Sequence, residues 1–215
     1  MSGLVRLIAA VDPAERPAMA AAAQQLAEAL TTGAGEAWQV SLATVAPGAR
    51  FSGDGEVVIA SLLPEAARAD EPIELTEARW RGRLIELGGW ASAVTICTVF
   101  RLVSDRGEAG RQTLQRIRRL NLMAVRLSHE LGVGVADLDR ALAWLGARRV
   151  GTDYRLRGSA IADEVAGHAV AWALLSCGLD AVVDPQLQMQ AKAVLGDLHR
   201  IDALLARRLG QAAHG

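Results

Sequence analysis

The chain has 215 residues, of which 51% are hydrophobic, 22% charged and 4% aromatic, and its formal net charge is −1. This length suits one domain of ordinary size with room for a terminal appendage. A net charge near zero argues against nucleic acid as the main partner, because neutralising phosphates requires a surplus of basic residues. No run approaches the roughly 18 apolar residues that a membrane span needs. Residues 1–15 also lack the pattern of a cleaved signal peptide, so we expect a cytoplasmic protein without a membrane span.

The first predicted strand stops abruptly in the sequence VDPAER, residues 11–16. An apolar run that ends at Asp12-Pro13 and continues into an alanine-rich helical segment is typical of the start of an α/β domain. Many enzymes place a nucleophile at such a joint. Here the joint carries Pro13, which has no hydroxyl to attack a carbonyl group.

Five short apolar runs rich in β-branched residues alternate with longer segments of helical period, which predicts a parallel sheet covered by helices. Their nearly continuous hydrophobicity suits strands that are buried on both faces. The predicted strands are residues 5–11, 39–45, 56–62, 93–100 and 133–138. The predicted helices are residues 17–30, 75–87, 110–131 and 159–176. We therefore expect an α/β domain over residues 1–183, with a five-stranded parallel sheet in a three-layer α/β/α arrangement.

A separate C-terminal helix is predicted over residues 184–215. Asp184 and Pro185 form a helix start, with an acidic N-cap and a proline at the first helical position. Apolar residues then recur at alternating steps of four and three, as in a coiled-coil seam. They are Leu187, Ala191, Val194, Leu198, Ile201 and Leu205. Two interpretations stay open: the amphipathic helix folds back onto its own domain, or it mediates contact with a second copy or another partner protein.

The two cysteines, Cys97 and Cys177, are far apart and have no histidine neighbours. That spacing indicates neither a disulfide framework nor a zinc site. We expect both thiols to be reduced and buried, and we expect no metal and no cofactor.

The stretch from residue 116 to residue 180 resembles the second half of an SGNH (GDSL-type) hydrolase. It reads RIRRLNLMAVRLSHELGVGVADLDRAL and, after a short loop, GTDYRLRGSAIADEVAGHAVAWALLSCGL. In that family a helix with an Arg/Asn-containing start leads into a strand ending in Asp, and a loop with an Asp-x-x-His signature then opens the final helix. The resemblance covers residues 4–180 as a pattern of elements. It implies the three-layer fold of SGNH-hydrolase or flavodoxin-like type. Since the family acts on ester-linked acyl groups, the resemblance also implies ester chemistry as the activity to be tested.

The first three catalytic blocks of the family match this chain only in part. The Gly-Asp-Ser block falls on Val11-Asp12-Pro13, so the acid is kept and a proline takes the place of the nucleophile. Pro13 also lacks the backbone N–H that an oxyanion hole would use. Gly48 matches the second-block glycine. The third block, which supplies an Asn in the family, falls on residues 60–65, where no Asn occurs.

The final block, Asp-x-x-His, falls on Asp153, Tyr154, Arg155 and Leu156. Asp153 matches the acid, but Leu156 stands in the position of the histidine base. Arg155 beside it stays protonated and is a poor general base, whereas its guanidinium suits a carboxylate or phosphate. The resemblance thus implies a chain without the serine nucleophile, the oxyanion Asn and the base His.

The leading interpretation is an SGNH-like protein that is non-catalytic or repurposed and binds a partner protein or a small acyl or carbohydrate ligand. The expected ligand-binding residues are Asp12, Gly48, Asp153 and Arg155. One alternative is an esterase or acyltransferase acting on acylated carbohydrate or lipid, with Asp12, Ser61 and Asp153 as catalytic candidates in a rearranged site. Another alternative is a structural subunit of an assembly.

Asp137 and Asp139 alternate at the end of the last predicted strand, so their side chains share one face at the carboxyl edge of the sheet. Such a pair supports acid/base chemistry or caps the next helix, and we expect Asp139 to be the cap. His168 is expected to be a core or interface residue. A cluster of arginines predicts either an anion-binding surface or a solvated helix face. Its members are Arg106, Arg111, Arg116, Arg118 and Arg119.

Overall fold

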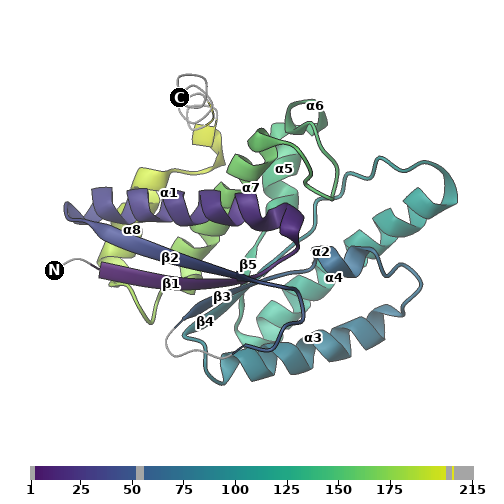
Figure 1. Ribbon diagram of the computed structural model, residues 1–215, viewed down its shortest axis with the longest axis horizontal. Helices are drawn as coiled ribbons and strands as arrows, with labels where there is room; N and C mark the ends of the chain where they lie inside the picture. The colour runs from purple at the N-terminus through teal and green to yellow at the C-terminus, as the bar shows by residue number, and fades with distance from the viewer. Residues whose placement is uncertain (1–2, 52–55, 202–204, 206–215) are drawn as a thin grey trace.

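The computed structural model describes residues 3–51, 56–201 and 205, and it places a parallel sheet at the centre of the molecule (Figure 1). The strands are β1 (Gly3–Ala10), β2 (Trp38–Val45), β3 (Val57–Ser61), β4 (Ala93–Cys97) and β5 (Gly134–Ala136). Their order is β2-β1-β3-β4-β5, and every neighbouring pair is parallel. This is the strand order of flavodoxin-like folds. The predicted fold class, including the five-stranded parallel sheet, is confirmed.

Helices cover both faces of the sheet. One layer contains α1 (Arg16–Ala34), α5 (Leu138–Leu145), α7 (Ala160–Ala173) and α8 (Pro185–Leu195). The opposite layer contains α2 (Leu63–Ala66), α3 (Ile73–Gly88) and α4 (Gly107–Leu131). A short helix, α6 (Ala147–Val150), follows α5. None of the helices within the described residues has both the length and the apolar composition needed to cross a bilayer.

Strand β3 shows why the strands read as continuous apolar runs. All five of its residues are buried. Val57 and Ile59 pack into the core beneath α1 and α7, while Val58 and Ala60 pack into the core beneath α3 and α4. Because successive strand side chains point to opposite faces, a strand with a helix layer on each side must be apolar at every position.

Strand β4 ends at Cys97, three residues before the predicted end at Phe100. The cause is Asn121 of α4. Its Oδ1 accepts from Val99 N at 2.8 Å, and its Nδ2 donates to Val99 O at 2.8 Å. A side chain thus takes the place of the neighbouring strand, and the apolar run continues as a buried loop.

The C-terminal segment folds back onto its own domain over the described residues. Helix α8 packs against α1 and ends at Gly196, whose φ is 73°. Of the predicted seam, Ala191, Ile201 and Leu205 are buried in the core beneath α1. The helix expected over residues 184–215 is therefore interrupted after Leu195, and residues 206–215 lie outside the described residues. A dimer contact through this segment stays a prediction.

Helix α7 crosses α1 at a point where only glycine fits. A Cβ built on Gly167 would lie 2.8 Å from the Cβ of Ala21, 2.8 Å from Ala22 N and 2.9 Å from Ala18 O. Two of these three atoms are backbone, so they have little freedom to move away. The alanine-rich sequence of α1 and Gly167 together allow the two helices to approach closely.

We predict that Gly167→Ala lowers the free energy of unfolding by about 1–3 kcal/mol, because the added methyl group overpacks this crossing. The matched control is Gly82→Ala on α3, where a Cβ meets nothing within 4 Å. That change should raise stability by up to about 1 kcal/mol through helix propensity. Urea unfolding of both variants measures the difference. Equal stability of the two variants would mean that the crossing relaxes freely.

Candidate functional site

The carboxyl ends of β1, β3 and β4 meet at one edge of the sheet, where open α/β folds bind ligands. Three adjoining hollows lie along this edge. The first, of about 280 Å³, is lined by Gly48, Ser61 and Pro64 among others. The second, of about 150 Å³, shares Pro64 with it and adds Asp12. The third, of about 550 Å³, shares Asp12 and continues to Asp163.

Asp12 closes the loop after β1 as the N-cap of a single 3₁₀ turn, η1 (Pro13–Glu15). Its Oδ1 accepts from Ala14 N at 2.9 Å, and its own N–H donates to Glu15 Oε2 at 3.0 Å. This reciprocal arrangement is a capping box, which satisfies backbone donors at the start of a helix. The fold therefore uses Asp12 to shape the loop, and its other face lines two of the hollows.

Glu15 points inward from this turn and meets the end of β3. Ser61 Oγ donates to Glu15 Oε1 at 2.5 Å and accepts from Leu63 N at 3.0 Å. The two side chains are almost fully enclosed, with Glu15 1% and Ser61 2% exposed. Ser61, a catalytic candidate from the sequence, is thus bonded to a buried carboxyl group.

Burial dominates the electrostatics of this pair. Loss of solvent raises the pKa of Glu15 to about 7, although hydrogen bonds from Ser61 and the Asp12 backbone favour the charged form. Cys97, at the end of the adjacent strand β4, is also fully buried, and both its burial and the charge of Glu15 raise the pKa of its thiol. The site therefore contains acidic groups that are disfavoured as anions.

Asp153 and Arg155 form a closed unit on the loop before α7. Asp153 Oδ1 accepts from the backbone N–H of Arg155 at 3.0 Å, and its Oδ2 pairs with Arg155 Nη1 at 2.6 Å. Arg155 Nη2 also pairs with Asp105, and its guanidinium lies 4.6 Å from the ring centroid of Tyr154. Asp12 and Arg155 line the same small hollow. The two acids that the sequence placed together, Asp12 and Asp153, each have their own partner.

Leu156, which holds the position of the family's histidine, has an unusual backbone. Its φ is 53°, and it is the one non-glycine residue with positive φ among the described residues. A branched side chain in this left-handed region is strained. Its N–H donates to Asp153 O at 3.0 Å, which closes the turn. The loop thus holds Arg155 in place at a conformational cost.

The paired acids at the end of β5 have different roles from the predicted ones. Asp137, rather than Asp139, is the N-cap of α5 and accepts from Arg140 N at 3.1 Å. Asp139 instead accepts from Arg101 N at 2.9 Å and from Asn121 Nδ2 at 3.3 Å. The prediction placed the cap two residues too late, because the strand ends at Ala136 and the helix begins directly after Asp137.

The histidines do not supply a base to this edge within the described residues. His129 is exposed near the end of α4, and His168 is buried on α7 with its ring 6.5 Å from that of Trp172. The core placement of His168 agrees with expectation. The side chain of His199 and all of His214 lie outside the described part of the chain. No group of metal-ligating side chains occurs among the described residues either.

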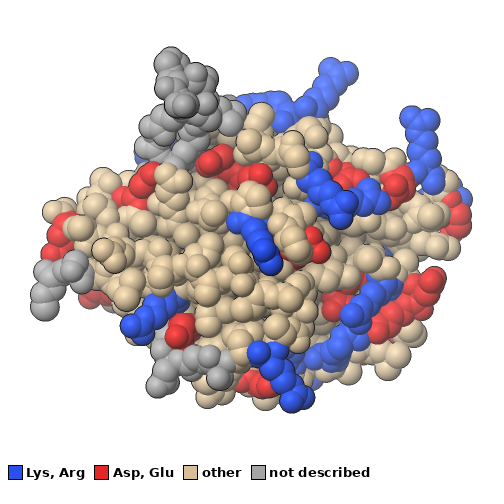
Figure 2. Space-filling view, viewed as in Figure 1, with Lys and Arg blue, Asp and Glu red and all other residues tan. Residues whose placement is uncertain are grey.

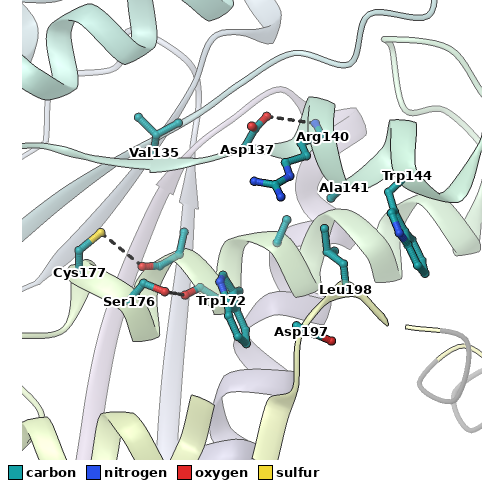
Figure 3. A pocket seen from close by; sticks show the side chains of 12 residues that line it. Val135, Asp137, Arg140, Ala141, Trp144, Trp172, Ser176, Cys177, Asp197 and Leu198 are labelled. Atoms are coloured by element: carbon teal, nitrogen blue, oxygen red, sulfur yellow. Dashed lines mark hydrogen bonds between the residues drawn. The ribbon is translucent and has the colours of Figure 1, made fainter. Parts of the chain in front are cut away.

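A fourth hollow, of about 450 Å³, lies away from this edge, beside β5 and between α5 and α7 (Figure 3). Trp144 and Trp172 line it, but Lys192 Nζ lies 4.6 Å from the ring centroid of Trp172 and His168 stacks on the same ring. The indole of Trp172 is therefore engaged by the protein itself. Cys177 is exposed here, contrary to the prediction, because the wide turn after α7 (Leu174–Gly178) brings it to the surface.

The arginine cluster predicted on α4 divides into two kinds. Arg116 is buried, and the remaining members are exposed on the outer face of the helix, where Arg111 pairs with Glu108. The solvated-face interpretation fits the exposed members. They are Arg106, Arg111, Arg118 and Arg119.

Comparison with solved structures identifies the class of fold. A protein named as a GDSL-like lipase from Parabacteroides merdae aligns with a TM-score of 0.56 and 10% identity, over 90% of this chain and 96% of that chain. An acetyl xylan esterase from Geobacillus stearothermophilus aligns with a TM-score of 0.52 and 12% identity, over 85% and 97%. A lipase/acylhydrolase from Enterococcus faecalis aligns with a TM-score of 0.51 and 16% identity, over 81% and 95%. No family model and no curated protein matches the chain.

The chain therefore has the fold of the SGNH (GDSL-type) hydrolases, as its sequence pattern implied. Identities this low establish the fold alone, and function must be argued from the site. The candidate residues Asp12, Gly48, Ser61 and Arg155 all line the hollows at the carboxyl edge. Asp153 stands behind Arg155 as its ion-pair partner.

Sequence analysis missed Glu15, the residue at the centre of the site. A local signal for it exists, because Asp12 and Glu15 have the D-x-x-E spacing of a capping box ahead of a helix. That signal predicts the hydrogen bond between Glu15 and the Asp12 backbone. It does not predict the contact with Ser61, which lies 46 positions away in the chain.

We predict that the free energy of unfolding falls as the pH rises from about 4.5 to about 7, because Glu15 binds its proton more tightly in the folded chain than in the unfolded chain. Glu15→Gln should remove about 1–3 kcal/mol of this fall. Chemical unfolding across pH 4–8 measures it. Glu74→Gln, at an exposed position in the first turn of α3, is the control and should keep the fall. Parallel pH profiles for both variants would contradict the prediction.

Proposed function

We propose that this protein is an SGNH-fold protein that binds a small ligand at the carboxyl edge of its sheet and does not hydrolyse esters. The observation that carries the proposal is the use of the Ser61 hydroxyl in a buried hydrogen bond to Glu15, in a site where a proline occupies the nucleophile position. A nucleophile must reach the carbonyl carbon of its substrate, and Ser61 is 2% exposed.

The position of the histidine base supports the same proposal. Leu156 has no group that transfers a proton, and Arg155 is held by two carboxylates, those of Asp153 and Asp105. These pairs stabilise its charged form, and the hydrogen bond that Arg155 donates to Asp105 raises the pKa of Arg155. A guanidinium in this setting binds anions and does not accept a proton.

The edge nevertheless keeps space for a ligand. The three adjoining hollows extend from Gly48 past Ser61 and Asp12 to Asp163. Their walls combine proline and leucine side chains with five arginines and three acidic residues among the described residues, so they offer a ligand both apolar and charged contacts. A small acyl or carbohydrate compound fits the chemistry of these walls.

An esterase or acyltransferase is the second candidate, and one observation favours it. A carboxyl group with a pKa of about 7, bonded to a serine hydroxyl at 2.5 Å, has the proton affinity of a general base near neutral pH. This Ser61–Glu15 pair acts as a nucleophile and base only if the loop after β1 moves to admit a substrate.

The test is hydrolysis of short-chain p-nitrophenyl esters and of acetylated sugars by the purified chain. We expect no turnover above a heat-inactivated control, and no change in Ser61→Ala, Glu15→Gln or Asp153→Ala. Reproducible turnover that Ser61→Ala abolishes would overturn the proposal and establish the second candidate. Asp137→Ala, which removes the N-cap of α5 and the acceptor of the Thr98 hydroxyl outside the three hollows, is the control for general loss of structure.

A further inference from the structure

The hollow beside Ser61 differs from its two neighbours in charge. Three of its described lining residues carry a guanidinium, namely Arg68, Arg79 and Arg83, and one, Glu65, carries a carboxylate. The glycine of the Pro47-Gly48 turn forms the opposite wall, with Ala49 N donating to Ala46 O at 3.0 Å. Figure 2 shows basic and acidic side chains interleaved over α3, whose residues form one side of this hollow.

The carboxylates near the hollow are already bonded to other groups. Glu65 Oε2 pairs with Arg79 Nη2 at 2.6 Å, and its Oε1 accepts from Trp80 Nε1 at 3.1 Å. Glu71 pairs with Arg79 Nη1 at 2.8 Å and accepts from Thr76. Arg79 therefore neutralises part of both acids. Their remaining contacts go to Arg116, whose Nη2 lies 3.4 Å from Glu71 Oε2, and to Arg68, which lies 3.7 Å from Glu65 and 4.0 Å from Glu71.

Arg116 fixes this wall from beneath. It is 4% exposed, and its guanidinium donates to Glu65 O at 3.3 Å and Glu71 O at 2.7 Å. A buried guanidinium that bonds two backbone carbonyls holds the segment between them rigidly. The hollow is thus formed by a preorganised network, in which the positions of the charges are set before any ligand arrives.

Among the three arginines that line the hollow, Arg83 is the one without an ion pair to a described carboxylate. Its Nη2 is shielded from solvent, and neither a hydrogen bond nor an ion pair joins Arg83 to any described residue. Its guanidinium lies 5.4 Å from the ring centroid of Trp80. Glu65 and Glu86 attract it only at longer range, and burial lowers the pKa of Arg83. A half-buried cation without a hydrogen-bond acceptor is costly to the fold, and the negative charge of an anion in the hollow that Arg83 lines would offset part of that cost.

We propose that this hollow is an anion subsite in which Arg83, beside Arg68, holds a carboxylate, phosphate or sulfate group of the ligand. The proposal rests on the proposed function, since it names the chemical class of the compound bound at the same edge. Gly48 and Ser61 border the subsite, so the remainder of the ligand extends toward Asp12. The volume of about 280 Å³ admits one such group with a short substituent.

The test uses inorganic phosphate, sulfate and acetate as probes against sodium chloride at matched ionic strength. We expect at least one probe to raise the Tm of the native chain and to bind saturably in calorimetry. Arg83→Gln should weaken that binding by roughly tenfold or more, as expected for loss of a charge-assisted hydrogen bond. Arg83→Lys should retain part of the affinity, because a lysine keeps the charge without the planar donor geometry.

Arg81→Gln is the matched control. Arg81 lies on the same helix and pairs with Glu77 and Glu130, outside the hollow. Its loss should leave phosphate or sulfate binding unchanged. Without any probe, Arg83→Gln should unfold close to the temperature of the native chain, because the contact with the Trp80 ring is lost while a buried charge without a hydrogen-bond partner is removed.

Two results would overturn the anion subsite. One is the absence of any probe effect beyond that of chloride, and the other is an equal loss of binding in Arg81→Gln and Arg83→Gln. Failure of the proposed function is a separate result, since it is read from ester turnover. If the chain hydrolyses esters, the subsite still predicts that Arg83→Gln raises KM for esters with an anionic group and leaves KM for neutral esters unchanged.

Discussion

The hydrogen bond between Ser61 and Glu15 decides what the carboxyl edge of this sheet can do. It joins the loop after β1 to the end of β3, and the same carboxyl group accepts from the Asp12 backbone. The Glu15 carboxyl group therefore ties the turn after β1 to itself and to the end of β3 inside the site. A carboxyl group buried at this point is costly as an anion, so the pair favours a closed, partly protonated interior. In the proposed function, this bond gives the centre of the SGNH-fold edge a structural role.

Charge at the same edge is arranged around arginine, and the arginines are not equivalent. Arg155 is neutralised by Asp153 and Asp105, and Arg79 by Glu65 and Glu71. These four ion pairs fix the positions of the two guanidinium groups, and partly exposed ion pairs of this kind add little to stability. Arg83 is one turn of α3 beyond Arg79 and has no carboxylate at bonding distance. The difference comes from the reach of Glu65, which is held in place by Arg79 and the Trp80 indole.

The sequence predicts the fold well because its signals are periodic. Strand β3 is apolar at every position since both of its faces are covered, and that pattern is visible without any structure. The end of β4 is not visible, because it depends on Asn121, which reaches Val99 from another element. The site divides in the same way. The local motifs at Pro13 and Leu156 predict a missing serine and a missing histidine, and that stays a prediction. The Ser61–Glu15 bond and the isolation of Arg83 arise from tertiary contacts that no local motif shows.

Two local violations of ordinary structural rules occur at this edge, and their placement is informative. Leu156 holds a left-handed backbone conformation beside the largest of the three hollows, and Arg83 keeps a solvent-shielded nitrogen without a partner beside another. Each feature costs on the order of 1–3 kcal/mol. Natural sequences tend to retain such costs where a ligand or a reaction uses them. Buried polar atoms without a partner also occur away from this edge, for example Trp38 Nε1 at the start of β2. The two features therefore support the proposed ligand site only together with the hollows that Leu156 and Arg83 line.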